Sequence, residues 1–382
     1  MQFRDLEAQY HALQAGIDKG IADVIRGGRY ISGPQVGELE QRLAEYVGVK
    51  HCVTCGNGTD ALQLALMAWG VGPGDAVFVP DFTFFASGEV VAAVGATPVF
   101  VDVDSRTFNL DPVKLEEAVV SVLKRGHLNP AAVVVVDLFG LPADYDSIRP
   151  ICEKYQIKLL EDGAQGFGGS IGSRRVCSFG DISTTSFFPA KPLGCYGDGG
   201  AIFTDDDDWA SLLRSFAVHG KGSFKYDNVR IGMNSRLDTL QAAVLLAKLD
   251  TFVLEEIDAV NQVARWYDDM LSGCEYLLPL IPEGFTSSFA QYTIQLEENV
   301  DRACLQERLR SEGIPTMVYY PKPMHEQKAF ANGSSVSFDC SVTERLCSTV
   351  LSLPMGPYVS KEDVSRVAAE LHSCLRETVC HG

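Results

Sequence analysis

The sequence has little positive charge and no long uninterrupted apolar run. Its 382 residues include 32 Lys and Arg against 50 Asp and Glu, which gives a formal net charge of −18 and argues against binding a polyanion such as nucleic acid through bulk charge. No apolar stretch approaches the length of a membrane span, and no charged-then-apolar leader opens the chain. We therefore expect a soluble, cytoplasmic protein that binds neither nucleic acid nor membranes.

The cysteines follow no framework that would indicate disulfides or a metal. Eleven are scattered along the chain, and the one close pair, Cys52 and Cys55, has no second pair at zinc-finger spacing. We expect reduced, mostly buried thiols and no metal site. Internal repeats and low-complexity segments are also lacking, so the length suits a large domain and a smaller one.

Short β-rich runs alternate with helical stretches from about residue 50 to about residue 205. Several of these runs are continuously apolar, as strands buried on both faces are. The pattern predicts an α/β fold with a mainly parallel sheet between helices, where ligands collect at the carboxyl ends of strands. The expected strands are HCVTC, DAVFVP, TPVFVDVD, AAVVVVDLFG, IKLLEDGA, ISTTSFF and GGAIFT.

A helical pattern occupies residues 235–271, where apolar side chains recur near helical spacing. This pattern predicts a long helix that leaves the large domain. Mixed α/β sequence with Gly and Pro follows it. We therefore assign residues 1–245 to a large domain and residues 246–382 to a smaller C-terminal α/β domain.

A glycine turn, within GNGTDALQLALMA, follows the first expected strand and leads directly into a helix. Backbone N–H groups at a helix start carry partial positive charge, so they can hold a phosphate. Gly58, Thr59 and Asp60 are closest to such a site. The same residues fit the G-x-G-x-x-A dinucleotide fingerprint, with Asp81 at about the expected distance. The turn alone thus leaves NAD, another phosphate cofactor and a ligand-free capping turn open.

A single lysine, Lys191, stands among turn-forming residues in SFFPAKPLGCYGDGGAI. The strand IKLLEDGAQ ends in two carboxylates, and burying a carboxylate is costly unless a helix end or a cation meets it. Asp162, Ser186, Lys191 and the glycine turn together supply the contacts that pyridoxal 5′-phosphate (PLP) requires. These are a carboxylate for the pyridinium nitrogen, groups for the phosphate, and an amine for the Schiff base. A nicotinamide cofactor needs no such lysine.

The motifs GNGTDAL, PDFTFFAS, EDGAQGFG, SFFPAKPLGCYGDGGAI and NSRLDTLQAA occur in the order found in nucleotide-sugar aminotransferases. The chain resembles their DegT/DnrJ/StrS-type group, which are PLP enzymes of fold type I. The resemblance runs from FRDLEAQY to LSLPMGPY and so covers nearly the whole chain. It implies a large domain with a seven-stranded sheet, and a homodimer whose active site is shared between subunits.

The resemblance also implies roles for residues around the cofactor. It makes Lys191 the Schiff-base lysine and the base of the proton shift. It pairs Asp162 with the pyridine nitrogen and lets Gln165 reach the ring hydroxyl. Thr59 and Ser186 are expected to hold the phosphate.

Further roles concern the ring face and the neighbouring subunit. Phe84 is expected to stack on the ring, with an ordinary core aromatic as the alternative. Asn234 is expected to reach the neighbour's phosphate. Arg236 is expected to bind a carboxylate or phosphate of the substrate through its planar fork, with a helix cap as the alternative.

Three positions depart from the pattern of the family, because each stands where His is common. These are Tyr319 in YYPKP, Asp137 in VDLFG and Gly356 in LPMGPY. We expect each to lie near the sugar or at the domain seam, and we include Tyr319 among the substrate-binding residues. The departures concern the substrate and leave the core chemistry as the resemblance implies.

The presence of Lys191 favours transamination over sugar dehydration, since the dehydratases of this family have His in its place. The resemblance implies glutamate as amino donor and a nucleotide-linked keto-sugar as acceptor. The motifs look most like those of enzymes for UDP-2-acetamido-2-deoxy-3-oxo-glucuronate in surface polysaccharide such as lipopolysaccharide O-antigen. A 3-keto or 4-keto deoxyhexose on dTDP, UDP or GDP, an NAD-linked oxidoreductase and a PLP-binding regulator without turnover are the alternatives.

Overall fold

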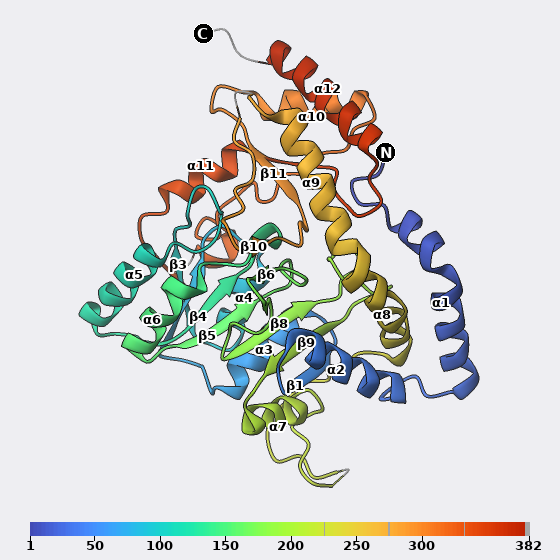
Figure 1. The fold of residues 1–382 in the computed structure, drawn as a ribbon. Coiled ribbons are helices and arrows are strands. Elements are labelled where there is room, and N and C mark those ends of the chain that lie inside the picture. Colours follow the sequence, from blue (N-terminus) through green and yellow to red (C-terminus); the bar gives the residue numbers. More distant parts are fainter. Residues whose placement is uncertain (225, 274–275, 332, 379–382) are drawn as a thin grey trace.

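An eight-stranded sheet organises most of the computed structural model (Figure 1), which describes residues 1–224, 226–273, 276–331 and 333–378. Its strand order is β1-β9-β8-β5-β4-β2-β3-β12. β9 pairs antiparallel with β1 and β8, and all other neighbours are parallel. The strands are β1 (His51–Cys55), β2 (Asp75–Pro80), β3 (Thr97–Val101), β4 (Asn129–Val136), β5 (Lys158–Asp162), β8 (Ile182–Ser186), β9 (Gly200–Thr204) and β12 (Val336–Ser337). The seven predicted strands are confirmed, and β12 is an addition from the C-terminal part.

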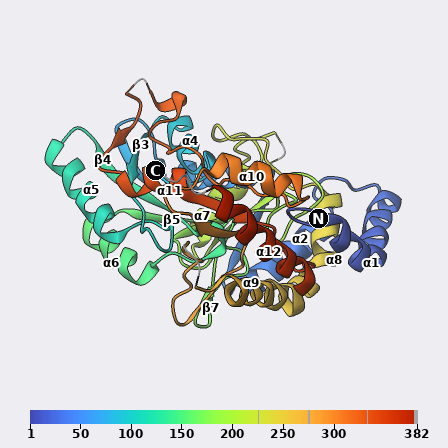
Figure 2. The ribbon, with the colours of Figure 1, turned by 90° about the horizontal axis from the view of Figure 1, so that it is seen from above.

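Helices cover both faces of this sheet, as predicted (Figure 2). Along β4, Val133 and Val135 belong to one core and Val134 to the other, because successive side chains of a strand point to opposite faces. The first core contains α2 (Pro34–Val47), α5 (Pro112–Arg125), α6 (Tyr145–Tyr155) and α8 (Thr239–Thr251). The second contains α3 (Gly58–Ala68), α4 (Ala86–Ala93), α7 (Asp207–Phe216) and α11 (Ser341–Thr349).

The predicted long helix is confirmed, with a later start and an interruption. α8 begins at Thr239, a π-helical turn spans Phe252–Glu256, and α9 continues over Ile257–Leu271. α1 (Leu6–Gly27) packs along α8, where a Cβ on Gly20 would lie 3.4 Å from the carbonyl oxygen of Ala243. The N-terminal helix α1 is thus packed against α8, the helix that leads from the large sheet to the C-terminal part of the chain.

A third hydrophobic core includes the buried residues of α9 from Val260 onward. It packs α9, α10 (Arg302–Ser311) and α12 (Lys361–Thr378) around the antiparallel pair β11 (Tyr292–Gln295) and β13 (Val350–Leu353). The remaining short elements are β6 (Ser170–Ile171), β7 (Arg174–Arg175), β10 (Phe285–Thr286), and the 3₁₀ turns Leu138–Gly140 and Lys328–Phe330.

The three cores indicate where the two domains meet. Phe252 packs into the core of the large sheet and Val260 into the third core. Leu346 and β12, although near the C-terminus, also belong to the large sheet and its cores. We therefore propose a boundary within the π-helical turn, later than residue 245, with part of the range 246–382 returning to the large domain. Positions 274–275, 332 and 379–382 of that range lie outside the described residues.

The thiols of Cys52, Cys55, Cys152, Cys177, Cys195, Cys304, Cys340 and Cys347 are free, and all of these except Cys304 are buried. This agrees with the expectation of reduced, buried thiols. No helix in the described part of the chain combines the length and the apolar character needed to cross a membrane.

Candidate active site

The glycine turn after β1 brings backbone donors to the end of the sheet. α3 starts at Gly58, and within the described residues the N–H groups of Gly58 and Thr59 have no hydrogen-bond partner. A Cβ on Gly58 would lie 2.8 Å from the Cβ of Ser186, so only glycine lets the turn approach the end of β8 this closely. Free N–H groups at a helix start beside a hydroxyl are suited to a phosphate.

Asp60, the third residue expected at this turn, is engaged within the chain. Its N–H donates to the side chain of Asn57 at 2.8 Å, and its carboxylate accepts from the hydroxyl of Ser235 at 2.6 Å. Asp60 therefore holds the turn in shape and offers no free donor. The prediction that Gly58, Thr59 and Ser186 hold a phosphate stays open, whereas the Asp60 N–H has no capacity left for one.

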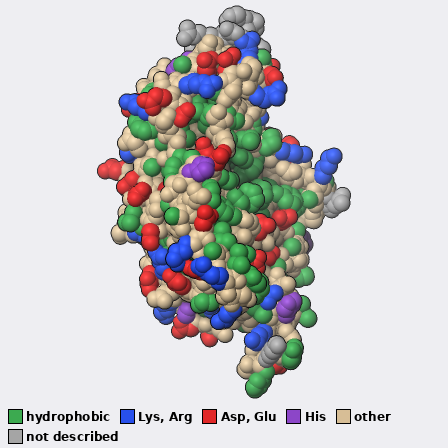
Figure 3. Space-filling model, turned by 90° about the vertical axis from the view of Figure 1, so that its right-hand side faces the viewer, with side chains coloured by type: hydrophobic (Ala, Val, Ile, Leu, Met, Phe, Trp, Pro, Cys, Tyr) green, Lys and Arg blue, Asp and Glu red, His purple; other side chains and the backbone are tan. Residues whose placement is uncertain are grey.

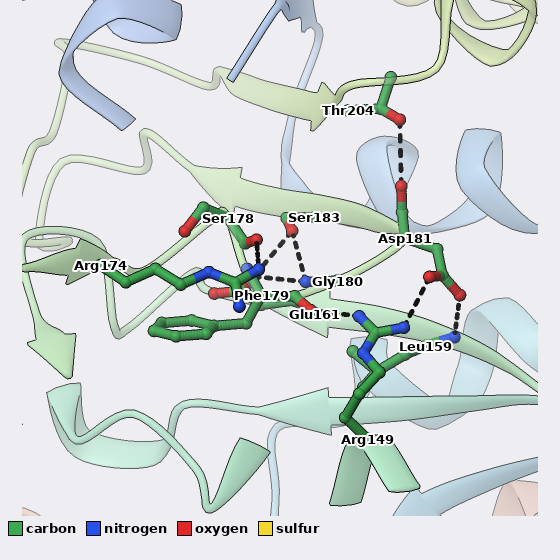
Figure 4. Close-up of polar contacts among 10 residues, drawn as sticks. All are labelled: Arg149, Leu159, Glu161, Arg174, Ser178, Phe179, Gly180, Asp181, Ser183 and Thr204. Carbon is green, nitrogen blue, oxygen red and sulfur yellow. Dashed lines mark hydrogen bonds and ion pairs between the residues drawn. The ribbon is translucent and has the colours of Figure 1, made fainter. Parts of the chain in front are cut away.

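The two carboxylates that end β5 have different environments because adjacent strand residues face opposite ways. Glu161 accepts from the N–H groups of Phe179 and Gly180 at 2.7 and 3.0 Å, and from the hydroxyl of Ser183 at 2.7 Å (Figure 4). It thus fixes the loop before β8. Asp162 faces the other side and accepts from the hydroxyl of Ser87 in α4 at 2.8 Å.

Asp162 and Lys191 influence each other's charge. Burial raises the pKa of Asp162, while the Ser87 hydrogen bond and the positive charge of Lys191 lower it. Burial lowers the pKa of Lys191, whereas Asp162 acts to raise it. The amine of Lys191 makes no hydrogen bond within the described residues, although its backbone N–H closes a turn with Phe188 at 2.8 Å. A lysine with a lowered pKa supplies the free amine that covalent catalysis needs.

Gln165, Tyr320 and Phe84 lie on the same side of the sheet as Asp162. The side-chain oxygen of Gln165 accepts from the N–H of Phe139 at 2.9 Å, and its nitrogen donates to the hydroxyl of Tyr320 at 3.1 Å. The rings of Phe84 and Tyr320 are 6.3 Å apart. Phe84 is 53% exposed, so the alternative of an ordinary core aromatic is wrong.

The sequence analysis missed Ser87 and Tyr320 as members of this group. Ser87 follows the expected strand DAVFVP at the position where a helix begins and ends the motif PDFTFFAS, but neither signal showed that it faces Asp162. Tyr320 adjoins Tyr319 in YYP, but nothing in the local pattern showed which of the two faces Gln165. Both contacts join segments distant in sequence.

The segment Asn234–Arg236 presents alternate side chains in opposite directions. Ser235 is buried and accepts from the N–H of Gly56 at 2.8 Å, while Asn234 and Arg236 are exposed. Arg236 makes no hydrogen bond within the described residues. α8 begins after Asp238, and the start of a helix disfavours a cation, so the helix-cap alternative for Arg236 is wrong.

Two of the three departures from the family pattern lie beside the N-terminal segment. The ring of Tyr319 is 6.2 Å from that of Phe3. A Cβ on Gly356 would lie 4.0 Å from the Cγ of Arg4. These positions agree with an expected place at the seam between the domains.

Asp137 does not face an open site, although the loop that follows it contacts the C-terminal part of the chain, since the N–H of Ser288 donates to the carbonyl of Gly140 at 3.0 Å. The Asp137 side chain is fully buried, and one carboxylate oxygen accepts from the N–H of Ala143 at 2.9 Å and from the hydroxyl of Tyr145 at 2.8 Å. All three residues belong to the large domain. Asp137 is therefore enclosed and presents no exposed atom to a sugar, and its expected place at the domain seam stays a prediction.

The structure also argues against the dinucleotide alternative. β1, which precedes the glycine turn, is an edge strand and pairs antiparallel with β9, whereas the fingerprint strand of a dinucleotide fold lies within a parallel sheet. The carboxylate of Asp81 accepts from the N–H of His325 at 2.8 Å and lies 2.7 Å from Nδ1 of the same residue. It is therefore not free to bind a ribose.

The residues gathered here fit PLP: free N–H groups for a phosphate, a buried carboxylate and an unpartnered lysine amine. A comparison with protein families matches residues 12–372 to the DegT/DnrJ/EryC1/StrS aminotransferase family. The chain belongs to the DegT/DnrJ/EryC1/StrS aminotransferase family. The expected family resemblance is thereby confirmed, as is the fold class.

Members of this family are similar to the chain over almost its full length. A UDP-2-acetamido-2-deoxy-3-oxo-D-glucuronate aminotransferase of Pseudomonas aeruginosa is 46% identical, covering 97% of this chain and 99% of the relative. A UDP-N-acetyl-3-dehydro-alpha-D-glucosamine 3-aminotransferase of Acidithiobacillus ferrooxidans is 40% identical, covering 97% of each.

Solved structures of similar proteins show the same fold. The crystal structure of a family member from Brucella abortus matches with a TM-score of 0.95 and 48% identity, covering 98% of this chain and 99% of that chain. The structure of NtdA from Bacillus subtilis with bound cofactor PMP matches with a TM-score of 0.84 and 29% identity, covering 96% of this chain and 82% of that chain.

Proposed function

We propose that this chain is a PLP-dependent aminotransferase that moves an amino group from glutamate to UDP-2-acetamido-2-deoxy-3-oxo-glucuronate. The observation that carries the proposal is the pair formed by the buried carboxylate of Asp162 and the unpartnered amine of Lys191. Free cysteines in the described part of the chain support a location in the cytoplasm. The product would serve surface polysaccharide such as the O-antigen of lipopolysaccharide.

Each residue of the site has a task toward the cofactor. PLP, when bound, supplies an electron sink that makes the α-proton of an amino acid labile. Asp162 would keep the ring nitrogen protonated, and Gly58, Thr59 and Ser186 would hold the phosphate. Lys191 would hold the cofactor and would remove the proton from the donor carbon in one half of the reaction and deliver a proton to the acceptor carbon in the other, for which its lowered pKa is suited.

The substrate proposal draws on the two named relatives. Both act on UDP-linked 3-keto sugars, and the more similar one acts on a uronate. Arg236 is exposed and makes no hydrogen bond within the described residues, so its guanidinium can bind an anionic group of such a substrate. The sugars differ in one carboxylate, which allows a direct test.

We propose a homodimer in which Asn234 and Arg236 serve the partner's site. Hydrophobic side chains gather in a band across the face seen in Figure 3. Exposed apolar residues flank the segment Asn234–Arg236 on both sides: Ile231 is 90% exposed, and Ile31 forms a β-bridge with Asp238. Large exposed apolar areas of this kind are typical of protein interfaces.

The test is amino transfer from ¹⁵N-glutamate to the UDP-linked 3-keto uronate, followed by mass spectrometry of the sugar. A second measurement records absorption spectra of the PLP-loaded protein before and after glutamate is added. We expect labelled product and a visible band that fades with glutamate in the wild type. Lys191→Ala should abolish transfer, a loss of about 10³-fold or more.

Lys19→Ala is the matched control, because Lys19 is an exposed helical lysine that pairs with Asp23. It should behave as the wild type. Unlabelled product in every sample, or full transfer by Lys191→Ala, would overturn the proposal. If transfer to the 3-keto sugar that lacks the carboxylate is preferred, the substrate is instead of the kind named for the Acidithiobacillus relative, UDP-N-acetyl-3-dehydro-glucosamine.

A further inference from the structure

The N-terminal segment that precedes α1 lies against the loop that carries Lys191. The N–H of Met355 donates to the carbonyl of Phe3 at 3.1 Å and fixes the segment beside the loop before α12. Figures 1 and 2 both show the N-terminus near α12. One guanidinium nitrogen of Arg4, Nη2, lies 3.5 Å from the carbonyl oxygen of Pro192, the residue after Lys191.

Arg4 has donors that the chain does not use. Its Nη1 is buried and has no hydrogen-bond partner among the described residues, and the contact of Nη2 with Pro192 is long. The nearby carboxylate of Glu256 accepts instead from Gln9 at 2.9 Å and from the hydroxyl of Tyr358 at 2.9 Å. A guanidinium remains charged even when buried and is costly to leave without an anion.

Positive charge exceeds negative charge around Arg4. Burial lowers the pKa of the Arg4 guanidinium, and the charge of Arg4 in turn lowers the pKa values of Lys191 and Lys248. The two anions in this group, Asp162 and Glu256, already have partners: Ser87 for the first, and Gln9 with Tyr358 for the second. A ligand that brings a further negative charge would correct this imbalance.

Gly356 leaves room next to the Arg4 side chain. A Cβ at this position would already be 4.0 Å from the Cγ of Arg4, so a longer side chain would compete for the space that Arg4 occupies. The lack of a side chain at Gly356 thus leaves this space to the Arg4 side chain.

We propose that Arg4, with the room left by Gly356, forms a carboxylate-binding subsite next to Lys191. The inference rests on the proposed function and names a specificity residue for it. The carboxylate belongs either to the uronate sugar or to the amino donor. Arg4 binds it through its planar, two-pronged donor face, which suits a carboxylate.

Equilibrium binding tests the subsite without turnover. UDP-glucuronate and UDP-glucose differ only in a carboxylate, so their dissociation constants for the PLP-loaded protein are compared by calorimetry in wild type, Arg4→Gln and Arg4→Lys. Glutarate serves as the unreactive mimic of the donor. Arg26→Gln is the matched control, since Arg26 is an exposed arginine that pairs with Asp23 in α1.

For a sugar carboxylate, the wild type should prefer UDP-glucuronate, and Arg4→Gln should lose roughly ten-fold or more of that preference while Arg4→Lys keeps part of it. For a donor carboxylate, the same loss should appear for glutarate. Arg26→Gln should bind all three ligands as the wild type does. Gly356→Leu should reproduce the Arg4→Gln result, because it crowds the guanidinium.

Unchanged dissociation constants for both carboxylate ligands in Arg4→Gln would overturn the subsite. Equal weakening for UDP-glucose and UDP-glucuronate would also overturn it, because a purely structural role of Arg4 acts on both. These outcomes are independent of the proposed function, which is tested separately by labelled amino transfer in the wild type and in Lys191→Ala. The two results can therefore be told apart.

Discussion

The hydroxyl of Ser87, in the first turn of α4, donates a 2.8 Å hydrogen bond to Oδ2 of Asp162 at the end of β5. The other oxygen of Asp162 accepts from the N–H of Ala164 at 3.2 Å. Burial raises the pKa of Asp162, and the Ser87 hydrogen bond opposes this rise. The ionised form of Asp162, which the proposed pairing with the ring nitrogen requires, is thus favoured by a serine.

Ser87→Ala should weaken the catalytic centre without removing either reacting group. Loss of a hydrogen bond to a buried charge costs about 1.5 to 3 kcal/mol, so we expect roughly a ten-fold or greater fall in kcat or in PLP affinity. The pKa of Asp162 should rise, and activity should fall at the acidic side of the pH profile. Ser121→Ala is the control, because Ser121 is a half-buried serine in α5 whose hydroxyl donates to the carbonyl of Glu117, far from Asp162 in the chain. Wild-type kinetics and an unshifted acidic limb would contradict the role of Ser87.

Gly58→Ala should damage the phosphate turn, because the added Cβ would lie 2.8 Å from the Cβ of Ser186. We expect a loss of roughly 1 to 3 kcal/mol in unfolding free energy, and weaker binding of PLP by equilibrium dialysis. Adding Ser186→Gly should restore the melting temperature but not PLP affinity, since the hydroxyl is then missing. Gly37→Ala, in α2 where a Cβ meets nothing within 4 Å, should keep or raise stability. Equal melting temperatures for Gly58→Ala and Gly37→Ala would refute the steric argument.

Asp137→Asn should stabilise the protein increasingly as pH rises. Burial and the neighbouring Glu161 hold the pKa of Asp137 well above its usual range. The unfolded state therefore ionises first, from about pH 4, and the stability that Asp137 lends at low pH is lost as pH rises toward its folded pKa. Asn has no such proton, and its oxygen can still accept from Ala143 and Tyr145.

Melting temperatures of wild type and Asp137→Asn between about pH 4 and pH 8 measure this effect. The melting temperature of Asp137→Asn should exceed that of the wild type by an amount that grows as the pH rises. Asp144→Asn, at the exposed start of α6, is a control for loss of one negative charge elsewhere. A constant difference across the range would mean that Asp137 is ionised in the folded protein.

Mixed dimers test whether Asn234 serves the neighbouring subunit. Lys191→Ala and Asn234→Asp should each be inactive alone. If each site combines Lys191 of one subunit with Asn234 of the other, random mixing leaves about a quarter of the sites intact. The transfer rate after denaturation and refolding of an equal mixture gives the answer. Sites built from a single subunit would show no recovery, and a protein that remains monomeric would contradict the proposed dimer.

The strands and the main site residues could be predicted because their signals are local. Continuous apolar runs indicate buried parallel strands, and the turn around Gly58 and the lysine in SFFPAK follow directly from such runs. Glu161 and Asp162 could be recognised together, but their separate tasks could not. That division depends on which face of β5 is covered by Ser183 and which by Ser87.

Contacts between distant segments could not be read from the sequence. Asp137 ends an expected strand, as site residues often do, yet its carboxylate turns toward Tyr145 and the interior. Arg4 approaches Pro192 only because the N-terminal segment is fixed by Met355, far along the chain. The π-helical turn at Phe252–Glu256 likewise has no local composition signal that would place a boundary there.

The pairing of β12 with β3 has a consequence for the order in which the protein can be completed. Val336 and Ser337 form an edge of the large sheet, and Leu346 fills one of its cores, although α9 and the third core come earlier in the chain. When the residues up to the π-helical turn have left the ribosome, the large domain still lacks an edge strand and part of its interior. It can reach its final form only after most of the smaller domain has been synthesised, so a fragment cut at the domain boundary would expose the side of β3.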